Sequence, residues 1–144
     1  MNLGEKKLDA YFKIIHNENN ITDRPHADIY NGLLDSVLFN TNEKFLLIYM
    51  LANSAGKINA VNTADLSMKR LSASSKMSKT TVYRYLKSLE EKGVLLKKKN
   101  YSEEKGNSAN TYIIINYISI WDSKTLEELK EKANKIKNEV LQNA

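Results

Sequence analysis

The side chains best suited to contact phosphates and base edges are concentrated in one short segment, residues 76–100. This segment holds eight lysines and arginines against two glutamates, a net charge of +6 in a chain whose total is +5. The rest of the chain is therefore close to neutral. Cations gathered in this way are typical of a nucleic-acid-binding surface. A lysine-rich face that contacts only solvent is the simpler alternative.

Helix geometry divides the middle of this segment into two faces. At about 3.6 residues per turn, Val82, Leu86 and Leu89 share an apolar face that we expect to pack against the domain. The opposite face carries hydroxyl, phenol, guanidinium and ammonium groups, which read base edges and bind phosphates. The DNA-binding residues predicted on and beside this helix are Ser78, Lys79, Thr80, Tyr83, Arg84 and Lys87.

Both ends of this helix are marked in the sequence. Ser78 is a good N-cap, and although a helix N-terminus can also hold a phosphate, we favour capping alone for its hydroxyl. Gly93 is placed as the left-handed glycine that follows a helix. The pattern predicts a helix over Lys79–Lys92. Ahead of it, Ser67 is expected to cap a shorter helix that begins at Met68 and fades by Lys76.

Two β-prone runs follow Gly93, VLLKKKNY and TYIIINYISIW, and they flank the polar loop SEEKGNSAN. This arrangement predicts a β-hairpin. We expect its basic residues to contact phosphates, although Glu103 and Glu104 in the loop would be repelled by them. The predicted contacts are Lys97, Lys98 and Lys99 in the first strand and Lys105 in the loop, with Asn107 as a weaker candidate.

The segments 67–72 and 77–95 together resemble winged helix-turn-helix domains, especially those of phage and plasmid replication proteins and of small regulators of mobile elements. The resemblance covers roughly residues 41–117. It implies that the predicted helix is the recognition helix and that Gly93 starts the wing strand. The chain departs from the family pattern at Ser72, Ser75 and Lys76, where a small residue, an apolar residue and a glycine are usual. We therefore expect a looser turn or a shorter first helix.

The predicted fold is mainly α with a small β-hairpin wing: a winged helix-turn-helix with an N-terminal extension and a C-terminal helix. The extension, residues 1–40, is expected to hold a strand at Tyr11–Ile15 and a short amphipathic helix within Ala27–Leu38. The winged domain, residues 41–120, is expected to start with a buried helix capped by Thr41 and ended near Gly56, with a short strand over Lys57–Val61. Residues 121–144 are expected to form the last helix, opened by Asp122 or Ser123.

The last helix carries an apolar stripe with spacings of 3, 4, 3 and 4 residues, typical of a coiled-coil seam. We expect it to join two copies of the chain, because two DNA half-sites multiply the affinity of a symmetric dimer. Packing of the stripe on its own domain is the open alternative. The stripe consists of Leu126, Leu129, Ala133, Ile136 and Val140, with added contacts expected from Ile118, Ile120 and Trp121.

Residue types that would support catalysis are not arranged for it. Cysteine is absent and the five glycines stand apart, which argues against a thiol nucleophile or a phosphate-binding loop. His16 and His26 lack partners at ligand spacing. The paired glutamates at 90–91, 103–104 and 127–128 are neighbours in sequence, so on a helix they point about 100° apart. We expect no enzyme, no metal site, no cofactor and no small-molecule effector.

The function predicted is sequence-specific binding of double-stranded DNA, as a dimeric transcriptional regulator on a pseudo-palindromic site. A plasmid or phage replication initiator or partition adaptor would use the same surface. A winged-helix module that binds only proteins is a third possibility, against which the basic segment argues. The first residues lack a signal-peptide pattern, and the apolar runs FLLIYMLA and IIINYISIW are too short to span a bilayer. We expect a cytoplasmic location and no contact with a membrane.

Overall fold

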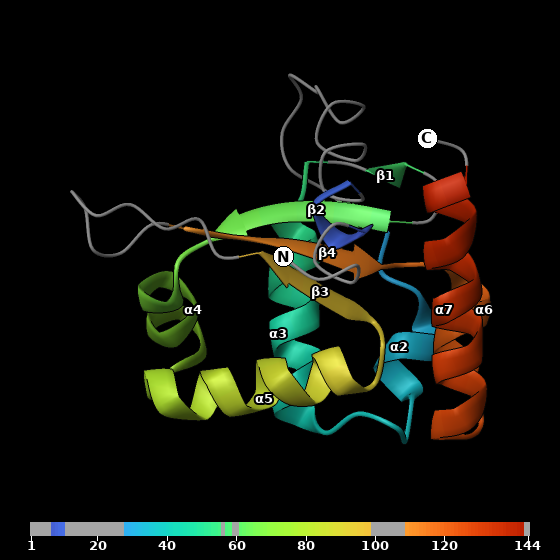
Figure 1. Ribbon diagram of the computed structural model, residues 1–144. Helices are drawn as coiled ribbons and strands as arrows, with labels where there is room; N and C mark the ends of the chain where they lie inside the picture. Colours follow the sequence, from blue (N-terminus) through green and yellow to red (C-terminus); the bar gives the residue numbers. More distant parts are fainter. Residues whose placement is uncertain (1–6, 11–27, 56, 59–60, 99–108, 143–144) are drawn as a thin grey trace.

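The computed structural model describes residues 7–10, 28–55, 57–58, 61–98 and 109–142. After a helical turn at 7–10, these residues form helices and strands that share one hydrophobic core (Figure 1). The helices are α2 Asn31–Asp35, α3 Thr41–Ala52, α4 Met68–Ser75, α5 Lys79–Glu91, α6 Ile118–Trp121 and α7 Leu126–Gln142. The strands are β1 Lys57–Ile58, β2 Val61–Leu66, β3 Leu95–Lys98 and β4 Asn110–Ile115.

The four strands form one antiparallel sheet in the order β1-β2-β4-β3. β2 runs beside β4 along its whole length, starting with Val61 opposite Ile115. β3 lies on the other side of β4, with Leu95 opposite Ile114. The predicted hairpin is therefore confirmed as β3 and β4, and β2 adds a third strand to it.

Helices α3, α4 and α5 gather on one side of this sheet (Figure 1). α3 contacts β2 and β4, α5 contacts β3, and α4 contacts both of the other helices. The three helices, the strand between the first two and the hairpin after the third make a winged helix-turn-helix. The predicted fold class is confirmed, with α2 before this unit and α6 and α7 after it.

The start of α3 differs from the prediction that Thr41 caps it. The N-cap is Asn40, whose side-chain oxygen accepts the Glu43 N–H at 2.8 Å, while the Glu43 carboxylate accepts the Asn40 N–H at 2.9 Å. This reciprocal capping box needs Glu or Gln three residues after the cap. Thr41 has Lys44 at that position, so it cannot form the box. α3 ends at Ala52, before Gly56.

Of the strand predicted over Lys57–Val61, the structure has β1 at Lys57–Ile58, whereas Val61 begins the next strand, β2, which takes in the polar stretch 62–65. Asn62, Thr63 and Ala64 are buried. Asn62 is stabilised there because its amide donates to Ser54 Oγ at 2.9 Å and its oxygen accepts from the Asn116 amide at 3.3 Å. A satisfied polar side chain can be buried in a central strand at little net cost.

The N-terminal helix is shorter than the amphipathic helix predicted within Ala27–Leu38. α2 buries Leu33 completely, but Leu34 and Val37 are exposed, the latter at 90%. Gly32 faces α6 at close range: a Cβ there would lie 3.1 Å from the backbone carbonyl carbon of Trp121. The strand predicted at Tyr11–Ile15 lies outside the described residues.

The end of the second β-prone run forms the short helix α6 rather than a continued strand. Trp121 of α6 is buried, and its indole N–H donates to Asn116 Oδ1 at 2.9 Å. α7 then begins at Leu126, after a turn in which the Thr125 hydroxyl accepts the Glu128 N–H at 3.1 Å. Thr125 therefore takes the place predicted for Asp122 or Ser123.

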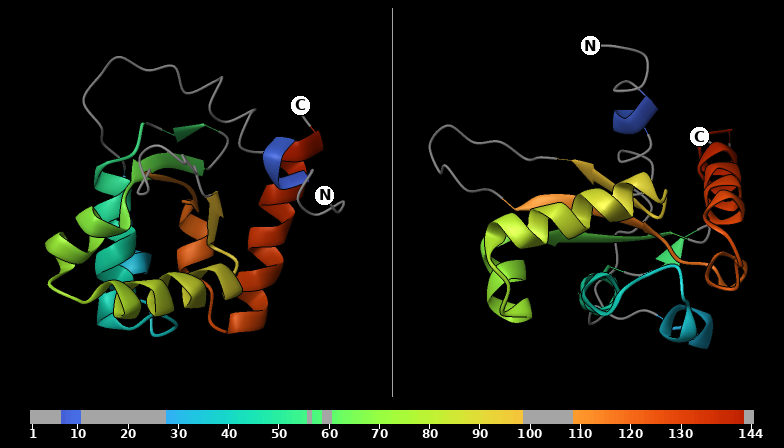
Figure 2. Two further views of the ribbon diagram at one scale, coloured as in Figure 1. Left: turned by 60° about the vertical axis from the view of Figure 1, so that its left-hand side comes forward. Right: turned by 90° about the horizontal axis from the view of Figure 1, so that it is seen from below.

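α4 and α7 lie at opposite ends of the molecule (Figure 2). The hydrophobic core continues between them, from Leu71 in α4 to Leu129 and Ala133 in α7. Of the helices in the described ranges, none combines the length and the apolar character needed to cross a bilayer.

Candidate nucleic-acid interface

Helix α5 is fixed by its apolar face and by both of its ends. Val82, Leu86 and Leu89 are fully buried, as the helix pattern predicts. Ser78 is the N-cap, and its hydroxyl oxygen accepts the Thr81 N–H at 3.2 Å. Gly93 follows the helix with φ of +91°, a conformation that favours glycine. The predicted boundaries of this helix are confirmed to within one residue.

The outer face of α5 brings the predicted contact residues together. Lys79, Thr80, Arg84 and Lys87 are exposed, and the Tyr83 ring is 49% exposed. These side chains offer hydroxyl, phenol, guanidinium and ammonium groups on one continuous surface. Such donors can bind phosphate oxygens, and an arginine can pair with a guanine edge through two hydrogen bonds.

The Arg84 side chain packs over the ring of the neighbouring Tyr85. Its guanidinium carbon lies 5.9 Å from the centre of the Tyr85 ring, within the range of a cation–π contact. The Tyr85 hydroxyl in turn accepts a hydrogen bond from the Asn42 amide of α3 at 3.2 Å. The Arg84 side chain is thus supported on a ring that is tied to the first helix of the domain.

A shallow hollow of about 320 Å³ lies between α5 and β3, lined by Tyr83, Lys87, Glu90 and Lys97. The Lys97 ammonium lies 5.0 Å from the centre of the Tyr83 ring, so β3 and α5 are in contact here. We name this feature the α5–β3 hollow. It joins the outer face of α5 to the wing and holds ammonium groups from both elements.

Glu90 is an acidic residue inside this basic surface. Partial desolvation raises the pKa of its carboxyl group, and the nearby ammonium groups of Lys97 and Lys87 oppose that rise. Glu90 is nevertheless exposed, as is Glu91 one residue further. The position of Glu90 beside Lys97 could not be predicted from α5 alone, because that lysine comes from β3.

The strand lysines of the wing point in different directions. Successive side chains alternate between the faces of a strand. Lys97 faces the α5–β3 hollow, whereas the ammonium of Lys98 pairs with the Asp9 carboxylate of the N-terminal turn at 3.6 Å. Lys99, Lys105 and Asn107, also predicted as contacts, lie outside the described residues.

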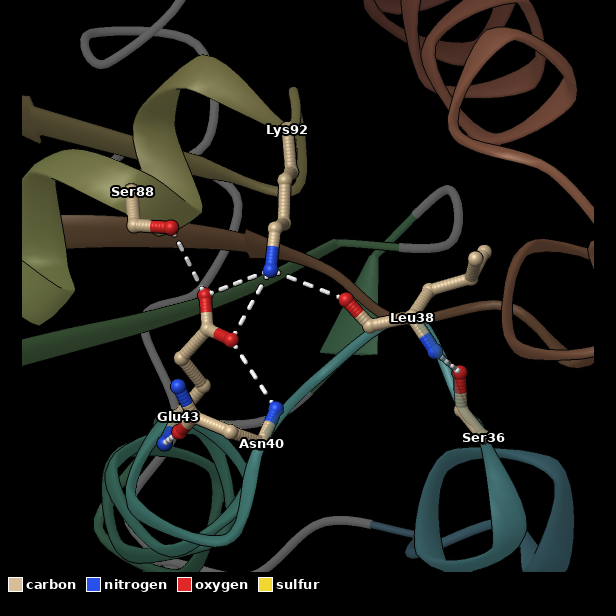
Figure 3. A network of polar contacts seen from close by, with 6 residues as sticks. All are labelled: Ser36, Leu38, Asn40, Glu43, Ser88 and Lys92. Atoms are coloured by element: carbon tan, nitrogen blue, oxygen red, sulfur yellow. Dashed lines mark hydrogen bonds and ion pairs between the residues drawn. The ribbon is translucent and has the colours of Figure 1, made fainter.

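One cation of the basic segment is part of the framework instead. The Lys92 ammonium is 2.8 Å from the Glu43 carboxylate and donates to the Leu38 carbonyl at 2.8 Å (Figure 3). The Ser88 hydroxyl donates to the same carboxylate at 2.9 Å. Glu43 is only 1% exposed. This network ties the end of α5 to the start of α3, so Lys92 adds no net charge to the outer surface.

The turn between α4 and α5 is tight although it departs from the family pattern. Lys76 adopts φ of 62° and ψ of 19°, the left-handed conformation that glycine usually supplies. Two side chains hold the turn: the Ser72 hydroxyl donates to the Met77 carbonyl at 2.5 Å, and Ser75 Oγ accepts the Met77 N–H at 3.2 Å. Of the two expected alternatives, a looser turn or a shorter first helix, the structure shows a turn held by serine hydrogen bonds and a first helix, α4, of eight residues.

Lys69 is a candidate contact that the sequence pattern did not indicate. It is exposed in the first turn of α4, next to the Ser67 cap. In helix-turn-helix docking, the first motif helix crosses the DNA backbone. The adjacent Arg70 has a different role, since its guanidinium donates to the Tyr49 hydroxyl at 2.9 Å and to the Asn53 side chain at 2.7 Å. The adjacent cations Lys69 and Arg70 in the sequence SMKR are the feature from which Lys69 could have been predicted as a contact.

The apolar stripe of α7 packs largely within its own chain. Leu129 and Ala133 are fully buried in the core, and Ile136 packs against it. A Cβ at Gly93 would lie 3.4 Å from Ala133 Cβ, which shows that α7 lies against the turn after α5. These buried residues are not available for a seam with a second copy. Leu126 is 42% exposed, and the side chain of Val140 lies outside the described set.

Among the described residues, no three His, Asp or Glu side chains are grouped so that they could hold a metal ion. His16 and His26 are not among those residues.

A family model described as a helix-turn-helix domain matches residues 39–95 of the chain. The matched segment spans α3, β1, β2, α4 and α5 and stops at the first residue of β3. No curated protein and no solved structure matches the chain. The family match supports a helix-turn-helix domain of the DNA-binding type at these residues.

Proposed function

We propose that the helix-turn-helix domain binds double-stranded DNA in a sequence-specific way and that the protein regulates transcription as a dimer. The observation that carries this proposal is the outer face of α5, where Thr80, Tyr83, Arg84 and Lys87 lie exposed on a helix that the core holds rigidly. A recognition helix docks in the major groove, with its N-terminal turns against the bases. The first three turns of α5 present these four side chains.

The remaining contacts extend from this face on two sides. We assign phosphate contacts to the helix N-terminus at Ser78, whose hydroxyl remains the cap, to Lys79 and to Lys97 in the wing strand. Lys69 of α4 lies where the first motif helix crosses the backbone. Lys98 is assigned a weaker phosphate contact at the edge of the interface, because its ammonium already pairs with Asp9. Lys99 and Lys105, which follow it in the sequence, are also assigned phosphate contacts.

The proposal is tested by footprinting on the DNA upstream of the protein's own gene, followed by fluorescence anisotropy on the protected site. Arg84→Ala should weaken specific binding by roughly 1–3 kcal/mol, because a side chain that reads a base edge contributes about that much. Binding to an unrelated duplex should change little. Lys124→Ala, which removes an exposed cation between α6 and α7, is the control and should bind as the parent does.

Two results would contradict the proposal. Absence of duplex binding by the parent at moderate salt would favour a module that contacts only proteins. Equal affinity of Arg84→Ala and the parent for the protected site would move the interface away from α5. The arrangement of protected sites separates the roles: one operator beside a promoter supports regulation, and a cluster of repeats supports replication or partition.

A further inference from the structure

The α5–β3 hollow contains an acidic group where a DNA-binding surface would be expected to hold cations alone. We propose that this hollow is the seat of one backbone phosphate of duplex DNA, and that Glu90 takes up a proton when the phosphate binds. The inference rests on the proposed function and deepens it, because it assigns a ligand group and a coupled proton to one part of the same surface.

The position of the hollow favours a backbone phosphate over a base. α5 and the wing are the two elements that would approach DNA, and the hollow lies between them, lined by Lys87 from the helix and Lys97 from β3. When a helix lies in the major groove and a wing lies beside it, a backbone strand passes between the two. Two ammonium groups and the Tyr83 hydroxyl are donors suited to the oxygens of a phosphodiester.

The carboxylate of Glu90 shares the same two ammonium groups in the free protein. Both Lys87 and Lys97 act on Glu90 electrostatically, each favouring its ionised form. A phosphate seated in the hollow would bring a second negative charge beside the carboxylate. Like charges placed close together disfavour each other's ionised form, and the carboxyl group is the one of the two that can take up a proton as the pH falls.

The other titratable groups that face Glu90 either disfavour the ionised form of its carboxyl group, as a bound phosphate would, or carry no charge. Glu91 on α5 is a like charge that opposes ionisation, and the Tyr112 hydroxyl on β4 stays protonated because burial raises its pKa. Desolvation has already raised the pKa of Glu90 in the free protein. Phosphate binding would raise it further, so the bound state holds more protons and the affinity must increase as the pH falls.

The experiment measures the affinity for the footprinted duplex between about pH 5 and pH 8 at constant ionic strength, for the parent, Glu90→Gln and Glu91→Gln. The parent should bind more tightly as the pH falls, by up to about tenfold per pH unit for one proton. Glu90→Gln should bind more tightly than the parent at neutral pH and should lose this part of the pH dependence. Glu91→Gln is the matched control, one residue away, and should keep it.

His16 and His26 are present in all three proteins, so any contribution of histidine protonation to the pH dependence of affinity is the same in each. A second measurement locates the phosphate: single methylphosphonates, which remove one backbone charge, are placed in turn along the duplex. At one position the substitution should reduce the pH dependence of the parent's affinity. It should leave the pH dependence of Glu90→Gln unchanged. Circular dichroism verifies that each variant is folded.

The inference is overturned if Glu90→Gln and the parent show the same pH dependence, or if no single methylphosphonate reduces it. Both of these results require that the parent binds the duplex. Failure of the parent to bind at any pH is a different outcome, because it contradicts the proposed function itself.

Discussion

At the scale of single residues, the fold decides what each lysine of the basic segment can do. Lys92 is neutralised by the buried Glu43, Lys98 pairs with Asp9, and Lys97 lies in the α5–β3 hollow. A count of charges along the sequence treats these three as equal. Their environments differ because one belongs to the end of a helix and the other two point to opposite faces of a strand.

This difference predicts unequal effects for two adjacent residues. Lys97→Ala should lower the affinity for duplex DNA and reduce the slope of log K against log salt by about 1, because one phosphate contact is lost. Lys98→Ala should change both quantities less. The measurement is anisotropy at several salt concentrations. A larger effect of Lys98→Ala would mean that DNA approaches the opposite face of the sheet.

At the scale of elements, the sequence predicted the structures whose signals are local. The caps Ser67 and Ser78, the terminating Gly93 and the buried face of α5 were all predicted correctly. Each of these depends on residues within one or two turns of one another. The hairpin was predicted for the same reason, since two β-prone runs flank a polar loop.

The elements that were missed depend on contacts between distant residues. The polar part of β2 is buried because Asn62 meets Ser54 and Asn116, and no local pattern shows those partners. The α6 run is apolar and short, which does not distinguish a strand from a buried helix. In the candidate site, α5 could be predicted from its own sequence, whereas the approach of Lys97 to Tyr83 and Glu90 required the fold.

The close contact between α2 and α6 can be tested through Gly32. Gly32→Ala places a Cβ 3.1 Å from the backbone of Trp121. Crowding of this kind costs roughly 1–3 kcal/mol, which should exceed the gain of about 1 kcal/mol in helix propensity. We expect a lower midpoint of urea unfolding. Asn31→Ala, at an exposed position of the same helix, is the control, and an unchanged midpoint for Gly32→Ala would show that α6 moves aside easily.

At the scale of the whole molecule, α7 closes the core at the end opposite α4. Leu129 and Ala133 belong to that core, and burial lowers the pKa of Lys137, further along the same helix. Substitution of Leu129 would therefore test folding more than association. For a dimer we propose contact around the start of α6 and α7, where the apolar side chains of Tyr117, Ile118 and Leu126 are exposed close together in the sequence.

We expect light scattering to give twice the mass of the 16.5 kDa chain. The double variant Ile118→Lys, Leu126→Lys should reduce this to the mass of one chain, because charges at an apolar interface are costly to bury. It should remain folded, since both side chains are about half exposed. Leu34→Lys, at another exposed apolar position, serves as the control. A parent with the mass of a single chain would remove the dimer from the proposal.

The polar contact between Trp121 and Asn116 also gives the molecule an optical reporter. Trp121 is the single tryptophan of the chain, and its ring meets Phe39 edge-on with ring centres 5.7 Å apart. Indole emission shifts to longer wavelength when water reaches the ring, so the intrinsic fluorescence reports whether α6 is seated on the core. Because Trp121 is buried and is not part of the α5 surface, its emission distinguishes a variant that has lost its fold from one that has lost only its contact with DNA.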